Sequence, residues 1–393
     1  MSEDSYVTDP SELRAVCVEL AQHSWLALDT EFVRERTFFP KLCLVQVAVP
    51  GRVACIDPLL LGDLEPLLQV LYDPGIVKVL HAAAQDLEIF YGLRAALPVP
   101  VFDTQIAATV LGQGEQVGYG GLVRALLGVE LEKGHTRTDW AQRPLEPGQL
   151  HYAADDVRYL RDIYLRQRQE LEARGRLSWL DEDFAELCDP ARYRMEPESA
   201  WRRVKGMSTL REAGLATLQQ LAAWREREAV ACNKPRRWIV GDEVLVELAR
   251  RRPREPALLE RSRGLGEAQI RRYGKEMLAA IAEAADLPRE AWPRRRERVQ
   301  LSSHQEALVD AASAVLRAYA ARHDVSPASL ASRADLERLV AGERDVALAH
   351  GWRAEIAGRA VLSLLEGKAG ISVDEGALKL TAARAGEAPP SKP

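Results

Sequence analysis

The feature that most constrains the fold is a change in pattern near residue 190. Three strand-like runs follow one another at WLALDTEFV (25–33), CLVQVAV (43–49) and RVACIDP (52–58), which suggests a meander. A fourth apolar run, GIVKVLH (75–81), lies among segments with helical spacing. We expect helices over 13–22, 64–72, 85–93, 103–112, 120–128 and 146–175. Strands first and βα alternation afterwards indicate an α/β domain with a mixed sheet.

Beyond residue 190 the pattern predicts helices only. Apolar residues recur at helical spacing within 224–285 and again within 304–367, with Pro and Gly at the breaks. We therefore expect the α/β domain to be followed by one or two all-α domains. The expected divisions are an α/β domain at 1–195, helical domains at 200–290 and 300–372, and a disordered tail at 380–393.

The composition is that of an ordinary soluble protein, with 47% hydrophobic and 28% charged residues. Its five cysteines are scattered, with no C-x-x-C pair, which argues against a disulfide framework or a structural zinc site and favours a reducing compartment. The N-terminal residues lack the order of a signal peptide, and no run of about 18 uncharged apolar residues exists. We expect a cytoplasmic protein without a membrane span.

Charge is distributed unevenly. Residues 1–200 carry a net charge of −13, residues 201–300 a net charge of +9, and the remainder −1. Such contrast often marks contact with nucleic acid. Arginine-rich helices that simply face solvent are the alternative explanation.

Two carboxylates interrupt the first apolar run. Successive side chains of a strand alternate between faces, so Asp29 and Glu31 project from the same face. Adjacent like charges repel unless a cation lies between them, and Mg2+ or Mn2+ prefers carboxylate oxygens. Taken alone, this pair also fits an exposed edge strand.

Two further segments place acids where helices are expected. Asp86 follows the 75–81 run at the start of a helix, a position that also suits a helix cap. Tyr152 and Asp156 are spaced i, i+4 and share one face of the 146–175 helix, where a surface acid beside a tyrosine is the alternative.

The segments D-T-E-F-V-R (29–34), H-A-A-A-Q-D (81–86) and Y-A-A-D-D-V-R-Y-L (152–160) together strongly resemble the ribonuclease D family. TDWAQRPLEPGQLHYAADD (138–156) matches that family equally well, and the resemblance covers roughly residues 10–180 of the nuclease domain. It implies a ribonuclease H-like 3′-to-5′ exonuclease whose site holds four acids and a tyrosine. By this resemblance the catalytic residues are Asp29, Glu31, Asp86, Tyr152 and Asp156.

Two divalent ions, Mg2+ or Mn2+, can stabilise both the attacking and the leaving oxygen of a phosphodiester. Our hypothesis is that Asp29 bridges both ions and that Glu31 and Asp156 complete the site that activates water. Asp86 would support the second ion, and the hydroxyl of Tyr152 would orient the water, since a free phenol has a pKa near 10.

A neighbouring register is possible, because His151 and Asp155 are also spaced i, i+4. A related subgroup uses a histidine five residues before the last aspartate, the spacing of His151 and Asp156. Along a helix, His151 lies about 140° from Asp156 and Tyr152 only about 40°. We therefore choose Tyr152, and expect His151 and Asp155 to be surface or supporting residues. Lys133, Arg137 and Arg143 surround T-D-W and could meet phosphate.

Residues 205–285 resemble the helical domain shared by RecQ-type helicases and ribonuclease D, chiefly at N-K-P-R-R-W. We expect residues 300–370 to be a second, more divergent copy. Lys234, Arg236 and Arg237 are the best candidates for binding an RNA backbone, with helix capping and solvation as the alternative.

The resemblance implies a metal-dependent 3′-to-5′ exoribonuclease that releases nucleoside 5′-monophosphates from small structured RNAs, above all tRNA precursors. We expect it to act as a monomer. A DNA exonuclease on the same fold is one alternative, because no residue announces a contact to the 2′-OH. A non-catalytic RNA-binding scaffold is the other, although all five motif positions are filled.

Overall fold

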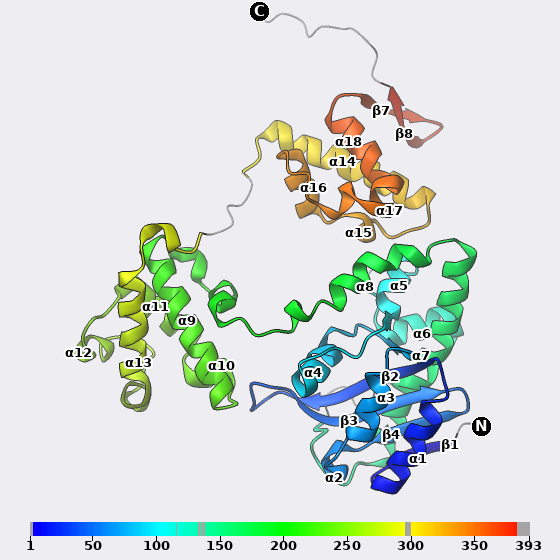
Figure 1. The fold of residues 1–393 in the computed structure, drawn as a ribbon. Coiled ribbons are helices and arrows are strands. Elements are labelled where there is room, and N and C mark those ends of the chain that lie inside the picture. The colour runs from blue at the N-terminus through cyan, green and yellow to red at the C-terminus, as the bar shows by residue number, and fades with distance from the viewer. Residues whose placement is uncertain (1–2, 115, 133, 135–137, 295–299, 383–393) are drawn as a thin grey trace, which may run out of the picture.

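The computed structural model describes residues 3–114, 116–132, 134, 138–294 and 300–382 of the 393-residue chain. A six-stranded mixed sheet forms the centre of the N-terminal region (Figure 1). In spatial order its strands are β1 (Glu3–Val7), β4 (Arg52–Ile56), β3 (Lys41–Val49), β2 (Trp25–Val33), β5 (Val77–Leu80) and β6 (Val101–Asp103). The β2–β3–β4 meander is antiparallel and the other pairs are parallel, so the expected mixed sheet is confirmed.

Helices cover both faces of this sheet. The N-terminal helices are α1 (Pro10–Leu20), α2 (Pro58–Leu61), α3 (Glu65–Leu71), α4 (Ala84–Arg94), α5 (Thr104–Val110), α6 (Tyr119–Leu127), α7 (Pro147–Ala173) and α8 (Asp181–Leu187). Apolar residues of α1, α3 and α4 share one core cluster with β2 and β3, whereas those of α5 and α7 belong to a second cluster. The expected long helix is α7, which begins with a capping box between Glu146 and Gln149.

Two groups of helices follow. The first helical group consists of α9 (Ala213–Ala231), α10 (Arg236–Ile239), α11 (Asp242–Arg251), α12 (Pro256–Leu259) and α13 (Glu267–Asp286). The second helical group consists of α14 (Ser303–Arg322), α15 (Pro327–Leu330), α16 (Arg333–Val340), α17 (Gly351–Arg353), a π-helical turn (Ala354–Gly358) and α18 (Arg359–Leu365). An α/β region followed by helical domains is the predicted fold class, which is confirmed.

The end of the described chain differs from the prediction. Residues expected to be helical up to 372 and disordered from 380 instead form an antiparallel hairpin, β7 (Ala369–Asp374) paired with β8 (Ala377–Ala382). Its turn places Glu375 and Gly376 at positive φ, 51° and 77°, as a two-residue hairpin loop requires. The rest of the expected tail, 383–393, lies outside the described residues.

The first helical group contacts the N-terminal α/β region (β1 to α8) through the loop that follows β2. Phe38 is buried in the core cluster of that group. The side-chain oxygen of Asn233 accepts hydrogen bonds from the backbone N–H groups of Phe38 and Phe39, at 3.1 and 3.2 Å. The guanidinium of Arg236 lies 4.5 Å from the centre of the Phe38 ring. The junction therefore combines one buried aromatic side chain, Phe38, with hydrogen bonds to the backbone on either side of it.

The second helical group shares its core with the N-terminal α/β region. A single cluster of buried side chains runs from the sheet and α7 through Leu180 into α14 and α18. Trp352 stacks on Trp179, with ring centres 4.5 Å apart and planes within 4°. Buried Arg353 binds both carboxylate oxygens of Asp183, at 2.6 and 2.7 Å.

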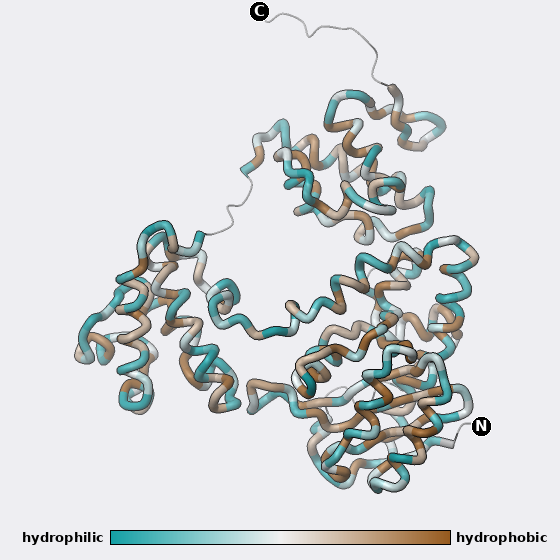
Figure 2. Tube along the Cα trace, in the orientation of Figure 1, coloured by the Kyte–Doolittle hydropathy of each residue, from teal (hydrophilic) through white to brown (hydrophobic). Residues whose placement is uncertain are grey.

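The central sheet and the segment that leads to the first helical group differ in hydropathy. Hydrophobic residues concentrate in the strands of the sheet, whereas the segment between α8 and α9 is mostly hydrophilic (Figure 2). In the described part of the chain, no helix has the length and apolarity needed to cross a membrane.

Candidate active site

Strand β2 places two acids on one face of the sheet. Leu26 and Leu28 are fully buried, which fixes the strand against the core on the opposite face. Asp29 pairs with Gln46 of β3 and Glu31 with Leu44, so both carboxylates project toward α7. The period-two prediction for Asp29 and Glu31 therefore agrees with the geometry.

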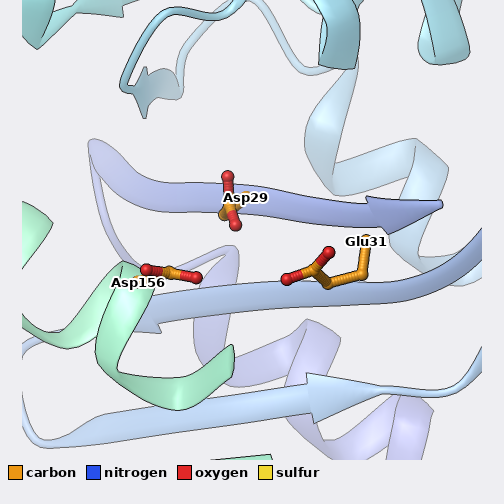
Figure 3. Close-up of side chains that lie close together, drawn as sticks. All are labelled: Asp29, Glu31 and Asp156. Atoms are coloured by element: carbon orange, nitrogen blue, oxygen red, sulfur yellow. The ribbon is translucent and has the colours of Figure 1, made fainter. Parts of the chain in front are cut away.

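Helix α7 supplies the third acid. Asp156 points toward the two acids of β2 (Figure 3), and each of the three side chains offers a carboxylate oxygen within 4.8 Å of the others. Asp29, Glu31 and Asp156 are all partly buried. Residues more than a hundred positions apart in the sequence are thus brought into one cluster, to which we refer as the acid cluster.

Asp86 lies beside this cluster rather than in it. It occupies the first turn of α4, is only 6% exposed, and accepts a hydrogen bond of 2.5 Å from the hydroxyl of Thr30. Asp29, Thr30 and Asp86 line one cavity of about 880 Å3. The expected fourth acid is therefore at the site, held through the residue that separates Asp29 from Glu31.

Tyr152 lies one helical turn before Asp156, and the two residues line a small cavity together. Its ring packs near that of Trp140, with centres 6.2 Å apart and planes at 34°. Trp140 is 4% exposed, so it packs against Tyr152 from inside the core.

The neighbouring pair faces the surface. The side chain of His151 is 61% exposed and lies 3.6 Å from the carboxylate of Asp155. Asp155 also binds Arg158 at 2.9 Å, and Arg158 binds Asp4 at 2.6 Å. These contacts engage His151 and Asp155 in a surface ion-pair network, whereas Asp156 joins the acid cluster.

Burial and mutual repulsion make the acid cluster unfavourable by itself. Burial, and then the charges of Asp86, Asp156 and Glu31, hold the pKa of Asp29 well above its usual range. Burial and its acidic neighbours raise the pKa of Glu31 to about 8. Burial is also the main cause that raises the pKa of Asp86 to about 7 and that of Asp156 to about 7.

Among the described residues, no ion pair involves any of these four acids. A bound cation is the arrangement that would compensate such charges. The donor set consists entirely of carboxylate oxygens, which fits Mg2+ or Mn2+ and not a softer metal.

A buried amide lies directly across from Asp29. Gln46 is fully buried, and neither its side-chain oxygen nor its nitrogen has a hydrogen-bond partner in the described structure. As the cross-strand partner of Asp29 it lies on the same face of the sheet. Buried amides are rarely left unpaired, so Gln46 is consistent with a hydrated ion at the acid cluster. Gln46 and Thr30 were not predicted from the sequence; each is a polar residue within an apolar strand, which is the signal that could have revealed them.

The arginine of the T-D-W segment has a structural role that was not expected. Arg143 does not face the cavity but forms two bonds to the buried carboxylate of Asp57, at 2.5 and 2.9 Å. It also donates to the backbone carbonyl oxygens of Trp140 and Cys43. Arg143 thus fixes the loop that leads into α7. Lys133 and Arg137 lie outside the described residues.

The basic candidates of the first helical group divide into two kinds. Arg236 binds both carboxylate oxygens of buried Glu226 at 2.5 Å and covers Phe38. Lys234 and Arg237 are exposed, next to Trp238 with 56% of its surface accessible. Arg236 therefore supports the junction, while Lys234 and Arg237 remain available to a ligand.

Comparison with known proteins identifies both parts of the chain. Residues 5–172 match a family described as 3′-5′ exonuclease, and residues 214–281 match the HRDC domain. Ribonuclease D of Sphingobium indicum is 42% identical over 380 residues, which cover 95% of this chain and 98% of that protein. Ribonuclease D of Granulibacter bethesdensis is 42% identical over 382 residues, which cover 95% of each.

A solved structure agrees over nearly the whole length. The crystal structure of Escherichia coli RNase D, described as an exoribonuclease involved in structured RNA processing, superposes with a TM-score of 0.80 at 34% identity and covers 93% of this chain and 99% of that one. The family resemblance of the three acidic motifs is thereby confirmed, and the chain belongs to the ribonuclease D family.

Proposed function

We propose that this protein is a metal-dependent 3′-to-5′ exoribonuclease that releases nucleoside 5′-monophosphates. The observation that carries the proposal is the convergence of Asp29, Glu31 and Asp156, which lie within 4.8 Å of one another without a basic partner in the described structure. Four carboxylates, with Asp86, would offset most of the charge of two Mg2+ or Mn2+ ions. Such ions, when bound, polarise a phosphoryl oxygen and lower the pKa of water.

The protein's own groups would divide the remaining work. Asp29, Glu31 and Asp156 would hold the ions, and Thr30 would orient the carboxylate of Asp86 toward them. The Tyr152 hydroxyl would position the attacking water, with the ring held by Trp140. The amide of Gln46 would hydrogen-bond to Asp29 or to a water beside it, which gives this buried group a partner.

The expected substrates are the 3′ ends of small structured RNAs, above all tRNA precursors. The E. coli relative is an exoribonuclease involved in structured RNA processing, which favours RNA over DNA as the substrate here. A non-catalytic scaffold is disfavoured because all five motif residues are present.

We further propose a cytoplasmic monomer, in keeping with five free cysteines. Residues 1–195, 200–290 and 300–372 would be its three domains, of which the third packs on the first through a shared core, and limited proteolysis tests these boundaries. The oligomeric state is tested by analytical ultracentrifugation of the purified protein, which should sediment as a monomer.

The decisive experiment incubates the protein and Mg2+ or Mn2+ with RNA and DNA of the same sequence and a 3′ extension. A ladder of RNA shortened from its 3′ end, with nucleoside 5′-monophosphates as products, is expected. Preferential shortening of the DNA would favour the alternative of a DNA exonuclease. If neither strand is shortened, the proposal that this protein is an enzyme is wrong.

Matched variants assign the residues. Asp156→Asn should abolish cleavage, whereas Asp155→Asn, one position away on the same helix, should retain it because Asp155 faces the surface network. Tyr152→Phe should be strongly impaired and His151→Ala should not. The reverse result would mean that His151, and not Tyr152, is the catalytic residue of this helix.

A further inference from the structure

A second cavity lies between the nuclease region and the first helical group. Its volume is about 700 Å3, and it is bounded by the loop after β2, by α4 and by the segment that leads to α9. We refer to it as the junction groove; its side chains include Phe39, Tyr91, Arg192, Tyr193, Arg194 and Arg203.

The junction groove adjoins the acid cluster. Ala84, Gln85 and Arg192 line both this groove and the cavity that contains Asp29 and Asp86. Ala84 and Gln85 immediately precede Asp86 in the first turn of α4. A chain bound in the groove would therefore reach the acids without crossing the surface of another element.

The two cavities have opposite charge. The cavity of the acids is lined by six acidic residues and two arginines. The junction groove is lined by five arginines and three glutamates. The phosphate groups of a bound strand are therefore attracted to the junction groove and repelled by the acidic residues that line the other cavity.

Two of the groove's five arginines, Arg194 and Arg203, have no carboxylate partner in the described part of the chain. Arg34 is neutralised by Glu88 at 2.7 Å and Arg236 by Glu226 at 2.5 Å. Arg194 and Arg203 are exposed, and no carboxylate in the described part of the chain lies within ion-pair distance of either. They are the groove's available phosphate-binding groups.

Aromatic rings lie beside these cations. Phe39 is 45% exposed although its neighbour Phe38 is buried. The rings of Tyr91 and Tyr193 lie 6.2 Å apart in the same groove. Free arginines alternating with accessible aromatic faces are the combination that binds single-stranded nucleic acid, since phosphates meet the cations and bases stack on the rings.

We propose that the junction groove binds the single strand of RNA just upstream of the 3′-terminal nucleotides, with phosphates on Arg194 and Arg203 and a base on Phe39. The proposal rests on the proposed exoribonuclease function and adds the path by which the strand reaches the acids. It assigns a substrate-binding role to the segment between the two domains, outside the predicted cluster at Lys234.

The test compares substrates of two lengths. The double variant Arg194→Gln/Arg203→Gln is set against Arg14→Gln/Arg211→Gln, which removes the same charge from two exposed arginines outside the groove. With a 12-nucleotide single-stranded RNA, the groove variant should raise KM about tenfold at an unchanged kcat. A dinucleotide, too short to enter the groove, should be cleaved as by the wild type.

Binding is measured separately, by fluorescence anisotropy of the 12-nucleotide RNA in the Asp29→Asn background. The groove variant should weaken binding about tenfold and reduce the slope of log Kd against log salt by about 1.4, as expected for two phosphate contacts on a single strand. Phe39→Leu should weaken binding about fivefold without changing that slope.

Equal 12-nucleotide binding by the groove and control variants would overturn the proposal, as would an equal loss on the dinucleotide. A loss confined to blunt double-stranded RNA would also overturn it, because the groove would then recognise a duplex. The anisotropy readout needs no cleavage, so failure of the wild type to shorten RNA would count against the proposed function alone.

Discussion

The two helical groups contact the nuclease region in different ways. The first helical group has its own core and receives one inserted side chain, Phe38. The second helical group continues the core of the nuclease region, and its buried Arg353 and Trp352 bind residues at and next to α8. The first group also carries the excess positive charge of the chain, whereas the region of the second is nearly neutral. The difference agrees with a binding role for the first group, as proposed above, and with a structural role for the second.

The largest effect is expected from a substitution that breaks the contact between the second helical group and α8. Arg353→Leu leaves Asp183 without its partner, and loss of one member of a buried pair costs about 3 kcal/mol. The free energy of unfolding in urea measures it. Arg333→Leu is the control, because its ion pair with Asp310 is 60% and 69% exposed and exposed pairs of this kind contribute little to stability. Equal losses would contradict a shared core.

Phe38→Ala breaks the first attachment. Removing this buried ring should cost about 2 kcal/mol, less than in a rigid core because two domains can relax around it. Hydrogen exchange should accelerate in α10 and at the end of α9, and remain slow in β2–β4. Phe39→Ala, in which a half-exposed ring is removed, should leave exchange unchanged. Faster exchange throughout the sheet would mean that this junction also stabilises the nuclease region.

Metal and pH should act on only one part of the molecule. The folded-state pKa values of Glu31, Asp86 and Asp156, about 8, 7 and 7, lie above those of the unfolded chain. Without metal, the folded nuclease region therefore binds more protons than the unfolded chain between about pH 4 and pH 8, so its stability falls as pH rises across that range and is lowest above pH 8. Mg2+ should restore that loss at pH 8.5 and have little effect at pH 5.5.

Calorimetry in EDTA and in Mg2+ measures this effect. The transition of the first helical group, which has a separate core, should not respond to Mg2+. A Mg2+ effect on that transition, or an equal effect at both pH values, would contradict the assignment of the acids.

The smallest effect concerns the basic residues of the first helical group. Lys234→Gln/Arg237→Gln should weaken RNA binding a few-fold and reduce its salt dependence, because both side chains are exposed. Arg236→Gln should leave the salt dependence unchanged and loosen the junction instead, since its guanidinium binds Glu226. A reduced salt dependence for Arg236→Gln would return it to the RNA-binding set.

Much of the fold followed from local patterns. The strands β2 to β4 are strongly apolar and adjacent in sequence, and α7 has a long helical repeat, so both were predictable. Strand β1 was not, because EDSYV is polar and pairs with β4 some fifty residues away. The β7–β8 hairpin was missed although its sequence alternates around Asp374–Glu375–Gly376, a recognisable turn signal.

The candidate site was predictable only in part. The period of a strand placed Asp29 beside Glu31, and the period of a helix placed Tyr152 beside Asp156. Contacts between distant segments, such as Thr30 with Asp86 and Arg143 with Asp57, have no local signature. Arginines in particular look alike in sequence, whether they bind phosphate or, as Arg143 and Arg236 do, a buried carboxylate.

The loop between β2 and the first helical group has a mechanical consequence. Its near end is fixed by the ladder that carries Glu31, and its far end by the ring of Phe38 in another core. Six residues (32–37) lie between Glu31 and Phe38, so their Cα atoms can be at most about 25 Å apart. The loop limits how far the basic side chains of the first helical group can move from the acids while Phe38 remains in the core of that group. An RNA strand that bound both, as proposed, would therefore span a limited number of nucleotides.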